Sequence, residues 1–125
     1  MTPEQKMVLE FHETFGIYAQ NKPGLVPDKV RDLRIRLIDE EFDEFKQACL
    51  TNNFLEVVDA IGDLLYVVYG AACAFGVDME PIFKEIHRSN MSKQGGALDM
   101  HGKWIKPSTY SPPDLAFLLE QQRRW

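Results

Sequence analysis

The sequence predicts an all-α fold, namely a four-helix bundle followed by an irregular C-terminal loop and a short terminal helix. Apolar residues recur at the spacing of amphipathic helices in four segments, and short connections separate these segments. Almost no stretch shows the alternation of apolar and polar residues that marks a half-buried strand. A length of 125 residues suits a single core, so we expect residues 1–125 to form one domain.

Residues that begin and end helices set the expected boundaries. Thr2 is suited to cap the first helix, which carries a proline in its first turn, and Pro23-Gly24 follows its end. Asn53 and Asp78 are suited to cap the third and fourth helices, and Gly76 ends the third. The expected helices span about residues 2–19, 28–50, 54–75, 78–91 and 114–124.

The segment after residue 92 differs in composition from the helices. It is rich in glycine and proline, including Gly95-Gly96 and Pro112-Pro113. Such residues favour turns, so we expect an ordered or semi-ordered loop that contains a small hairpin.

Acidic residues occupy positions in the third helix where core side chains are expected. The stretch from Leu55 to Val77 is almost unbroken apolar sequence, yet Glu56, Asp59 and Asp63 recur at i, i+3 and i+7, along one helix face. A buried carboxylate without a partner either takes up a proton or binds a cation. Three such carboxylates in a row therefore require a partner.

The second helix carries another acidic cluster. Glu41 and Glu44 continue the line of Arg34 and Leu37, so they border the buried side of the helix. The other acids of this segment fall mostly on the far face, where solvated ion pairs with basic neighbours are usual: Asp39, Glu40 and Asp43.

Adjacent antiparallel helices would bring the two clusters to one place. Carboxylate oxygens at i, i+3 on facing helices suit Mg²⁺ or Mn²⁺. A di-iron site of the bundle type needs Glu-x-x-His on two helices, and none of the three histidines has a glutamate at that spacing. No pair of cysteines has the spacing of a zinc site.

Two ordinary interpretations of these acids remain open. Asn53 as a helix cap and Glu56 three residues later match a capping box, which would explain Glu56 without a metal. Arg34 or Arg31 is a possible partner for Asp59 or Asp63 in a buried ion pair.

The motif Glu40-Glu41-x-x-Glu44, followed after a short stretch by Glu56-x-x-Asp59, resembles the EExxE…ExxD signature of the all-α nucleoside triphosphate pyrophosphohydrolases. Downstream, Ser89-Asn90-Met91-Ser92-Lys93 and the Gly102-Lys103, Lys106-Pro107 and Tyr110 region resemble the MazG-like subgroup labelled phosphoribosyl-ATP pyrophosphohydrolase-like. The resemblance extends from about Phe11 to Leu115 and implies a MazG-like helical bundle.

The resemblance implies a metal-dependent enzyme that converts an NTP or dNTP to the monophosphate and diphosphate, with two or three Mg²⁺ ions, or Mn²⁺, between the carboxylates and the substrate. The implied metal ligands are Glu41, Glu44, Glu56 and Asp59. The implied candidates for orienting or activating the attacking water are Glu40, Glu44 and Asp63. The candidates for binding the substrate are His12, Asn90, Lys93, Lys103, Lys106 and Tyr110.

Several of these candidates have ordinary structural roles as alternatives. His12 beside Phe11 suits a structural or surface position, Asn90 suits a helix C-cap, and each lysine suits a solvated surface.

Composition limits the partners and the compartment. A net charge of −5 without a basic patch argues against nucleic acid. Asp63 and two glycines interrupt the apolar run of the third helix, so we expect no membrane span. Cys49 and Cys73 fall in apolar helical patterns and suit reduced core residues of a cytoplasmic protein. The apolar excess of the third helix, together with the family habit, predicts a homodimer or homotetramer.

Two rival functions remain. One is hydrolysis of phosphoribosyl-ATP in histidine biosynthesis, against which the longer C-terminal tail with Tyr110 and Pro112-Pro113 argues. The other is a non-enzymatic acidic helical binding module, which the apolar context of Asp59 and Asp63 disfavours.

Overall fold

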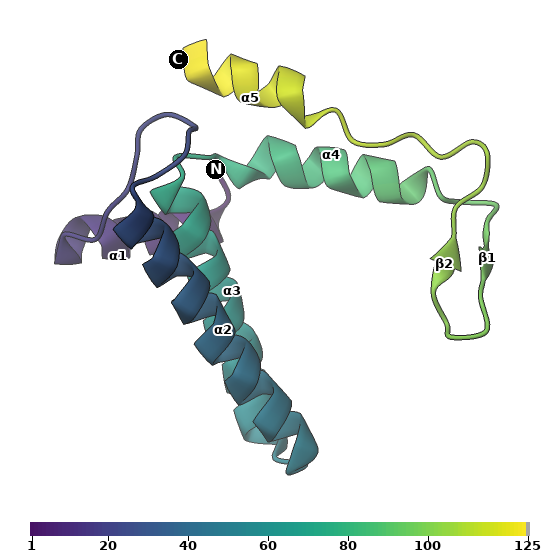
Figure 1. Ribbon diagram of the computed structural model, residues 1–125, viewed down its shortest axis with the longest axis horizontal. Coiled ribbons are helices and arrows are strands. Elements are labelled where there is room, and N and C mark those ends of the chain that lie inside the picture. The colour runs from purple at the N-terminus through teal and green to yellow at the C-terminus, as the bar shows by residue number, and fades with distance from the viewer. Residues whose placement is uncertain (125) are drawn as a thin grey trace. The chain divides into compact units, whose positions relative to one another are not determined.

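The computed structural model describes residues 1–124 and confirms the all-α fold (Figure 1). Residues 1–78 form one compact unit, and the chain from Met79 onward forms a second. The first unit contains α1 (Pro3–Phe15), α2 (Asp28–Leu50) and α3 (Phe54–Ala74). The second contains α4 (Met79–Met91), the strands β1 (Ala97–Leu98) and β2 (Trp104–Ile105), and α5 (Leu115–Arg124). The expectation that residues 1–125 form one domain stays a prediction.

In the first unit, α2 and α3 pack side by side as an antiparallel pair, and α1 packs against α3. Small side chains are buried on these helices, namely Ala48 on α2 and Ala60 and Ala74 on α3. Small side chains let helix backbones approach closely, so the side chains along the seam of α2 and α3 come within reach of one another. This seam positions the acidic residues.

Helix α1 ends at Phe15, four residues before the sequence predicts. The reason is Gly16, which takes the left-handed conformation with φ of 66°. The N–H of Ile17 then donates to the carbonyl of His12 at 2.8 Å, the hydrogen bond of a Schellman motif. The predicted end before Pro23-Gly24 was wrong, because Gly16 already ends the helix.

The expected ends of α3 are confirmed. The Asn53 side chain accepts from the N–H of Glu56 at 3.2 Å, which caps the helix. At the other end Gly76, with φ of 72°, follows the last turn, and a β-carbon on this residue would collide with the backbone carbonyl of Lys22.

We expect Gly76→Ala to destabilise the protein by about 3 kcal/mol, because the substitution combines a strained φ with a backbone collision. Chemical denaturation followed by circular dichroism measures the change. Gly62→Ala is the matched control, since a β-carbon there meets no atom within 4 Å. An equal effect of the two substitutions would contradict the close packing of the segment at Lys22 against the end of α3.

Much of the apolar surface of α3 is exposed in the first unit. Val58, Ile61, Leu65 and Val68 follow one another at helical spacing with exposed fractions of 50%, 45%, 56% and 46%. Among residues 1–124, α3 is the one helix that meets the length and composition of a membrane span, which is weak evidence from a single helix. The absence of a membrane span and the homo-oligomer both stay predictions.

The cysteine prediction was half right. Cys73 is buried as expected, whereas Cys49 on α2 is exposed.

The second unit confirms the small hairpin, in which β1 and β2 pair antiparallel with Ala97 opposite Ile105. Glu85 of α4 connects this helix to the segment that precedes α5. Its carboxylate accepts from Arg88 Nε at 2.7 Å and from the N–H of Asp114 at 2.8 Å, just before α5. The Arg88 guanidinium also donates to the carbonyl of Pro112 at 3.1 Å.

The contribution of these Glu85 contacts to stability depends on pH. The hydrogen bond from Arg88, followed by that from the Asp114 N–H, lowers the pKa of Glu85 to about 2. A depressed carboxyl pKa means that the contribution to stability is complete above the ordinary glutamate range and is lost as the pH falls toward about 2. NMR titration of the side-chain carboxyl carbon of Glu85 should therefore show a midpoint near pH 2. A midpoint at the ordinary glutamate value would contradict this connection, and Glu85→Gln should abolish the transition.

Candidate metal centre

Three carboxylates from two helices meet at the seam of α2 and α3. One oxygen each of Glu41 and Glu44 on α2 and of Asp63 on α3 lie within 4.8 Å of one another. The residues reach one place because Glu41 and Glu44 are three apart on α2, while Asp63 lies on the face of α3 that packs against α2. Asp63 was predicted to orient or activate water and not to bind the metal, whereas the structure makes it one of the three clustered carboxylates.

The cluster disfavours its own negative charge. Burial, followed by contact with Glu44 and by the charges of Asp63 and Glu40, raises the pKa of Glu41. Burial, followed by the charges of Asp59 and Glu44, raises the pKa of Asp63. Oε2 of Glu41 is buried and has no hydrogen-bond partner. A cation among the three groups would stabilise the ionised carboxylates of Glu41 and Asp63 and would give Oε2 of Glu41 a partner.

No basic side chain of the described residues supplies that cation. Arg31 pairs with Asp28 at 3.3 Å and with Asp32 at 2.9 Å. Arg34 is buried, and its Nη1 lies 3.3 Å from Nε2 of His12. The hypothesis of a buried ion pair from Arg31 or Arg34 to Asp59 or Asp63 is therefore wrong.

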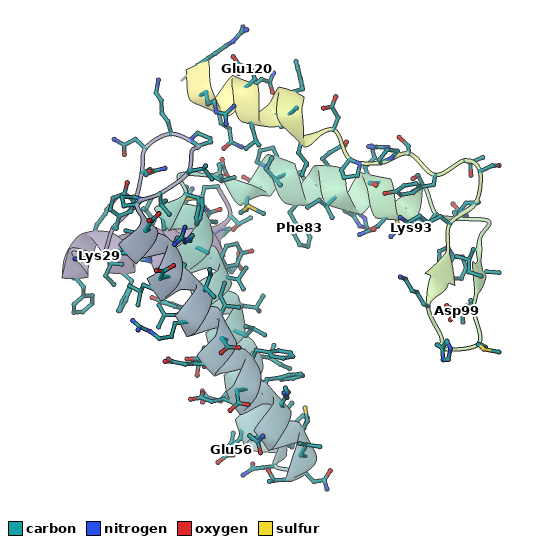
Figure 2. The ribbon with its side chains drawn as sticks, in the orientation of Figure 1. Lys29, Glu56, Phe83, Lys93, Asp99 and Glu120 are labelled. Atoms are coloured by element: carbon teal, nitrogen blue, oxygen red, sulfur yellow. The ribbon has the colours of Figure 1, made fainter. Side chains whose placement is uncertain are left out.

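Glu56 and Asp59 line an adjacent pocket of about 420 Å³ between the C-terminal half of α2 and the start of α3. Glu44 also lines this pocket, so it connects the three-carboxylate cluster with the other two predicted ligands. Figure 2 shows Glu56 near the end of the α2–α3 pair, where the turn joins the helices. The complete lining consists of Asp43, Glu44, Gln47, Ala48, Thr51, Glu56, Asp59 and Ala60.

The capping interpretation explains the backbone N–H of Glu56 but not its side-chain carboxylate. Its N–H is held by Asn53, but the N–H of Asn53 donates to the carbonyl of Ala48 at 3.2 Å and not to the Glu56 side chain. The reciprocal half of a capping box is thus absent, and the Glu56 carboxylate stays exposed at the pocket.

Asp43 was expected on the far face of α2, and this expectation was wrong. It lines the pocket because it lies one residue before Glu44 and four before Gln47, at the edge of the face that looks toward α3. Neither Asp43 nor Gln47 was identified as a site residue from the sequence. Their spacing from Glu44 was the signal available. Glu40 is exposed on α2, and its charge acts on Glu41.

His12 lies in the interior of the first unit, with 3% of its surface exposed. Its Nδ1 lies 3.1 Å from the carbonyl of Tyr18, which fixes the proton on Nδ1, and Nε2 then accepts from Arg34. Both ring nitrogens are therefore engaged within the protein, as in the structural alternative. The candidate role in substrate binding has no support from this geometry.

The second unit brings four of the predicted substrate-binding residues together (Lys93 is labelled in Figure 2). Nζ of Lys93 donates to Oδ1 of Asn90 at 2.8 Å. The same ammonium lies 5.8 Å from the ring centroid of Tyr110, and Nζ of Lys106 lies 4.7 Å from that centroid. Lys103 is not part of this group: it lies in the hairpin, and its N–H donates to Asp99 at 2.9 Å.

The donor set of the first unit fits a hard divalent cation. All of its candidate ligands are carboxylate oxygens, which Mg²⁺ and Mn²⁺ prefer, and an oxygen of Glu41 is buried without a partner. Glu41, Glu44 and Asp63 would hold one ion, while Glu56 and Asp59 face the adjacent pocket together with Glu44.

Comparison with known proteins agrees with this chemistry. The family model for phosphoribosyl-ATP pyrophosphohydrolase matches residues 8–90, which include α2, α3 and both acidic motifs. A segment of 75 residues is 41% identical to the uncharacterized protein L479 of Acanthamoeba polyphaga mimivirus. The match covers 57% of this chain and 30% of the viral protein, so the chain spans less than a third of the length of that relative.

Proposed function

The chain belongs to the phosphoribosyl-ATP pyrophosphohydrolase family, and on this premise we propose that it is a metal-dependent nucleotide pyrophosphohydrolase acting on an NTP or dNTP. The family gives the general kind of reaction, hydrolysis of a phosphoric anhydride with release of diphosphate. The proposal adds a nucleoside triphosphate as substrate, Mg²⁺ or Mn²⁺ as cofactor, and a role in removing unwanted nucleotides.

One observation carries the proposal. Five carboxylates of α2 and α3, namely those of Glu41, Glu44, Glu56, Asp59 and Asp63, line one cluster and one pocket with no basic partner among the described residues. Such a site repels a polyphosphate unless cations lie between them, and it holds those cations through oxygen ligands. When bound, Mg²⁺ polarises phosphoryl oxygens and lowers the pKa of a bound water.

Individual side chains of the protein have separate roles in this reaction. Glu44 lies at the junction of the cluster and the pocket, so its carboxylate is available to a cation in either place. We assign Asp63 the proton of the attacking water, because an oxygen of its carboxylate lies within 4.8 Å of the carboxylates of Glu41 and Glu44, beside the expected cation position. Glu40 is the alternative acceptor because it neighbours Glu41 on the exposed side.

In the second unit, Lys93 and Lys106 are suited to bind a phosphate group. Their two ammonium groups flank one aromatic ring and have no carboxylate partner among residues 1–124. Lysine ammonium groups commonly bind phosphate oxygens in proteins. Asn90 and Tyr110 hold these lysines in place through a hydrogen bond and a cation–π contact.

A second candidate substrate is phosphoribosyl-ATP, which the description of the matching family favours. Its cleavage also yields diphosphate, so the same carboxylates would serve.

We further propose that the protein acts in the cytoplasm as a homodimer or homotetramer, with the exposed face of α3 in the interface.

Diphosphate release from canonical and modified nucleoside triphosphates and from phosphoribosyl-ATP, with Mg²⁺ or Mn²⁺, tests the function. We expect metal-dependent release from at least one compound and none from the Glu56→Ala protein. Release from phosphoribosyl-ATP alone would replace the first substrate class with the second. No release from the whole panel, with a folded protein that binds Mg²⁺, would favour the binding-module hypothesis.

A further inference from the structure

The pocket beside the carboxylate cluster contains one uncommitted hydrogen-bond donor. Four of its side chains are carboxylates, which accept hydrogen bonds but donate none when ionised. The hydroxyl of Thr51 already donates to the carbonyl of Gln47 at 2.9 Å. The amide group of Gln47 makes no hydrogen bond within the described residues, so its N–H₂ is free to donate into the pocket.

Gln47 forms a pair with Asp43. The two residues are four apart on α2, so their side chains lie on one face about one turn from each other. Asp43 lies outside the motif of predicted metal ligands, and Gln47 is not a ligand that Mg²⁺ favours. Together they present a carboxylate acceptor next to an amide donor.

A ligand group that satisfies both must itself donate and accept. A phosphate only accepts hydrogen bonds, and Asp43 would repel it. A nucleobase has donors and acceptors, but it requires a flat apolar surface, and the lining of the pocket contains no aromatic residue. A sugar hydroxyl donates and accepts at one oxygen, and an acidic side chain on a ribose hydroxyl is a common arrangement in nucleotide sites.

We propose that Asp43 and Gln47 bind the 2′- and 3′-hydroxyls of a ribose, and that they make the site selective for ribonucleotides over 2′-deoxyribonucleotides. The inference rests on the proposed function, since it assigns the sugar of the same substrate. The pocket of about 420 Å³ lies in the size range of small-molecule sites and accommodates a sugar beside metal-bound phosphates.

Equilibrium binding, measured by calorimetry with Mg²⁺ and non-hydrolysable analogues, tests this assignment without requiring turnover. The ligands are a ribonucleoside triphosphate and its 2′-deoxy counterpart, each with a methylene group between the α- and β-phosphorus atoms. We expect the ribose compound to bind at least about tenfold more tightly, because the deoxy compound leaves Asp43 or Gln47 without a partner.

Two variants test the roles of the two side chains. Gln47→Leu removes the donor, and Asp43→Leu removes the acceptor. Each should weaken binding of the ribose compound and bring its ratio to the deoxy compound close to one, with binding of the deoxy compound little changed. Lys46→Met is the control, because its ammonium lies over the Phe42 ring at 5.5 Å and not in the pocket lining.

Equal binding of the two sugars by the unmodified protein would overturn the inference, as would a ratio that survives in both variants. Either result is compatible with diphosphate release and leaves the proposed function intact. Conversely, ribose-selective binding without diphosphate release would support the sugar site and overturn the proposed reaction.

Discussion

Glu44→Gln is expected to lower the rate of diphosphate release by about three orders of magnitude or more, which corresponds to roughly 4 kcal/mol in the barrier. Glu44 lies within 4.8 Å of Glu41 and Asp63 through its carboxylate oxygen, and it also lines the pocket with Glu56 and Asp59. Loss of this one charge therefore weakens cation binding in both places. The substitution preserves the shape and helix propensity of the residue.

Asp39→Asn is the matched control for this substitution. Asp39 lies on the same helix, is exposed, and is absent from the cluster and the pocket lining. Its removal should change the rate less than about twofold, since surface substitutions away from such features have small effects. Steady-state rates at saturating Mg²⁺ measure both proteins. Full activity of Glu44→Gln would show that the shared carboxylate is not part of the reaction.

The second large effect concerns stability. Asp63→Asn should raise the melting temperature of the metal-free protein, because it removes a charge whose pKa is raised by burial and by Asp59 and Glu44. In the unmodified protein, Mg²⁺ at about 100 times its dissociation constant adds about 2.7 kcal/mol, or roughly 10 °C. The variant should lose most of that increase, because the cation loses one of its ligands.

The direction of the pH effect follows from the same carboxyl groups. A raised pKa in the folded protein means that Asp63 and Glu41 keep their protons at a pH where the unfolded chain has lost them. The melting temperature of the metal-free protein should therefore fall as the pH rises from the ordinary carboxyl range through the raised pKa values. Mg²⁺ should reverse this slope. If Asp63→Asn instead unfolds the protein, the carboxylate has a structural role.

Helical periodicity was sufficient to predict the bounds of α2, which the structure gives as Asp28–Leu50. It also predicted the start of α3 after Asn53, because a cap and an apolar run coincide there. The end of α1 was missed because Gly16 stands before more apolar residues, Ile17 and Tyr18, which continue the pattern beyond the helix. A glycine in such a run is a weak signal until its φ is known.

Site residues were predicted from the sequence where a carboxylate interrupts an apolar helix pattern. They were missed where a polar residue fits the pattern around it. Asp59 and Asp63 were conspicuous because they interrupt an apolar helix. Asp43 and Gln47 were missed because a polar residue on a polar helix face is ordinary, and only the packing of α3 reveals that this face lines a pocket. The pairing of His12 with Arg34 depends on three helices meeting, which no local pattern contains.

Phosphorus NMR of a nucleoside triphosphate incubated with the protein, followed while Mg²⁺ is added to a chelated sample, tests most directly whether the α2–α3 carboxylates form a metal-dependent pyrophosphohydrolase. We expect no change with chelator, and then nucleoside monophosphate and diphosphate appearing in equal amounts once Mg²⁺ is in excess. Release of orthophosphate with a nucleoside diphosphate, or turnover that persists with chelator, would contradict the assignment.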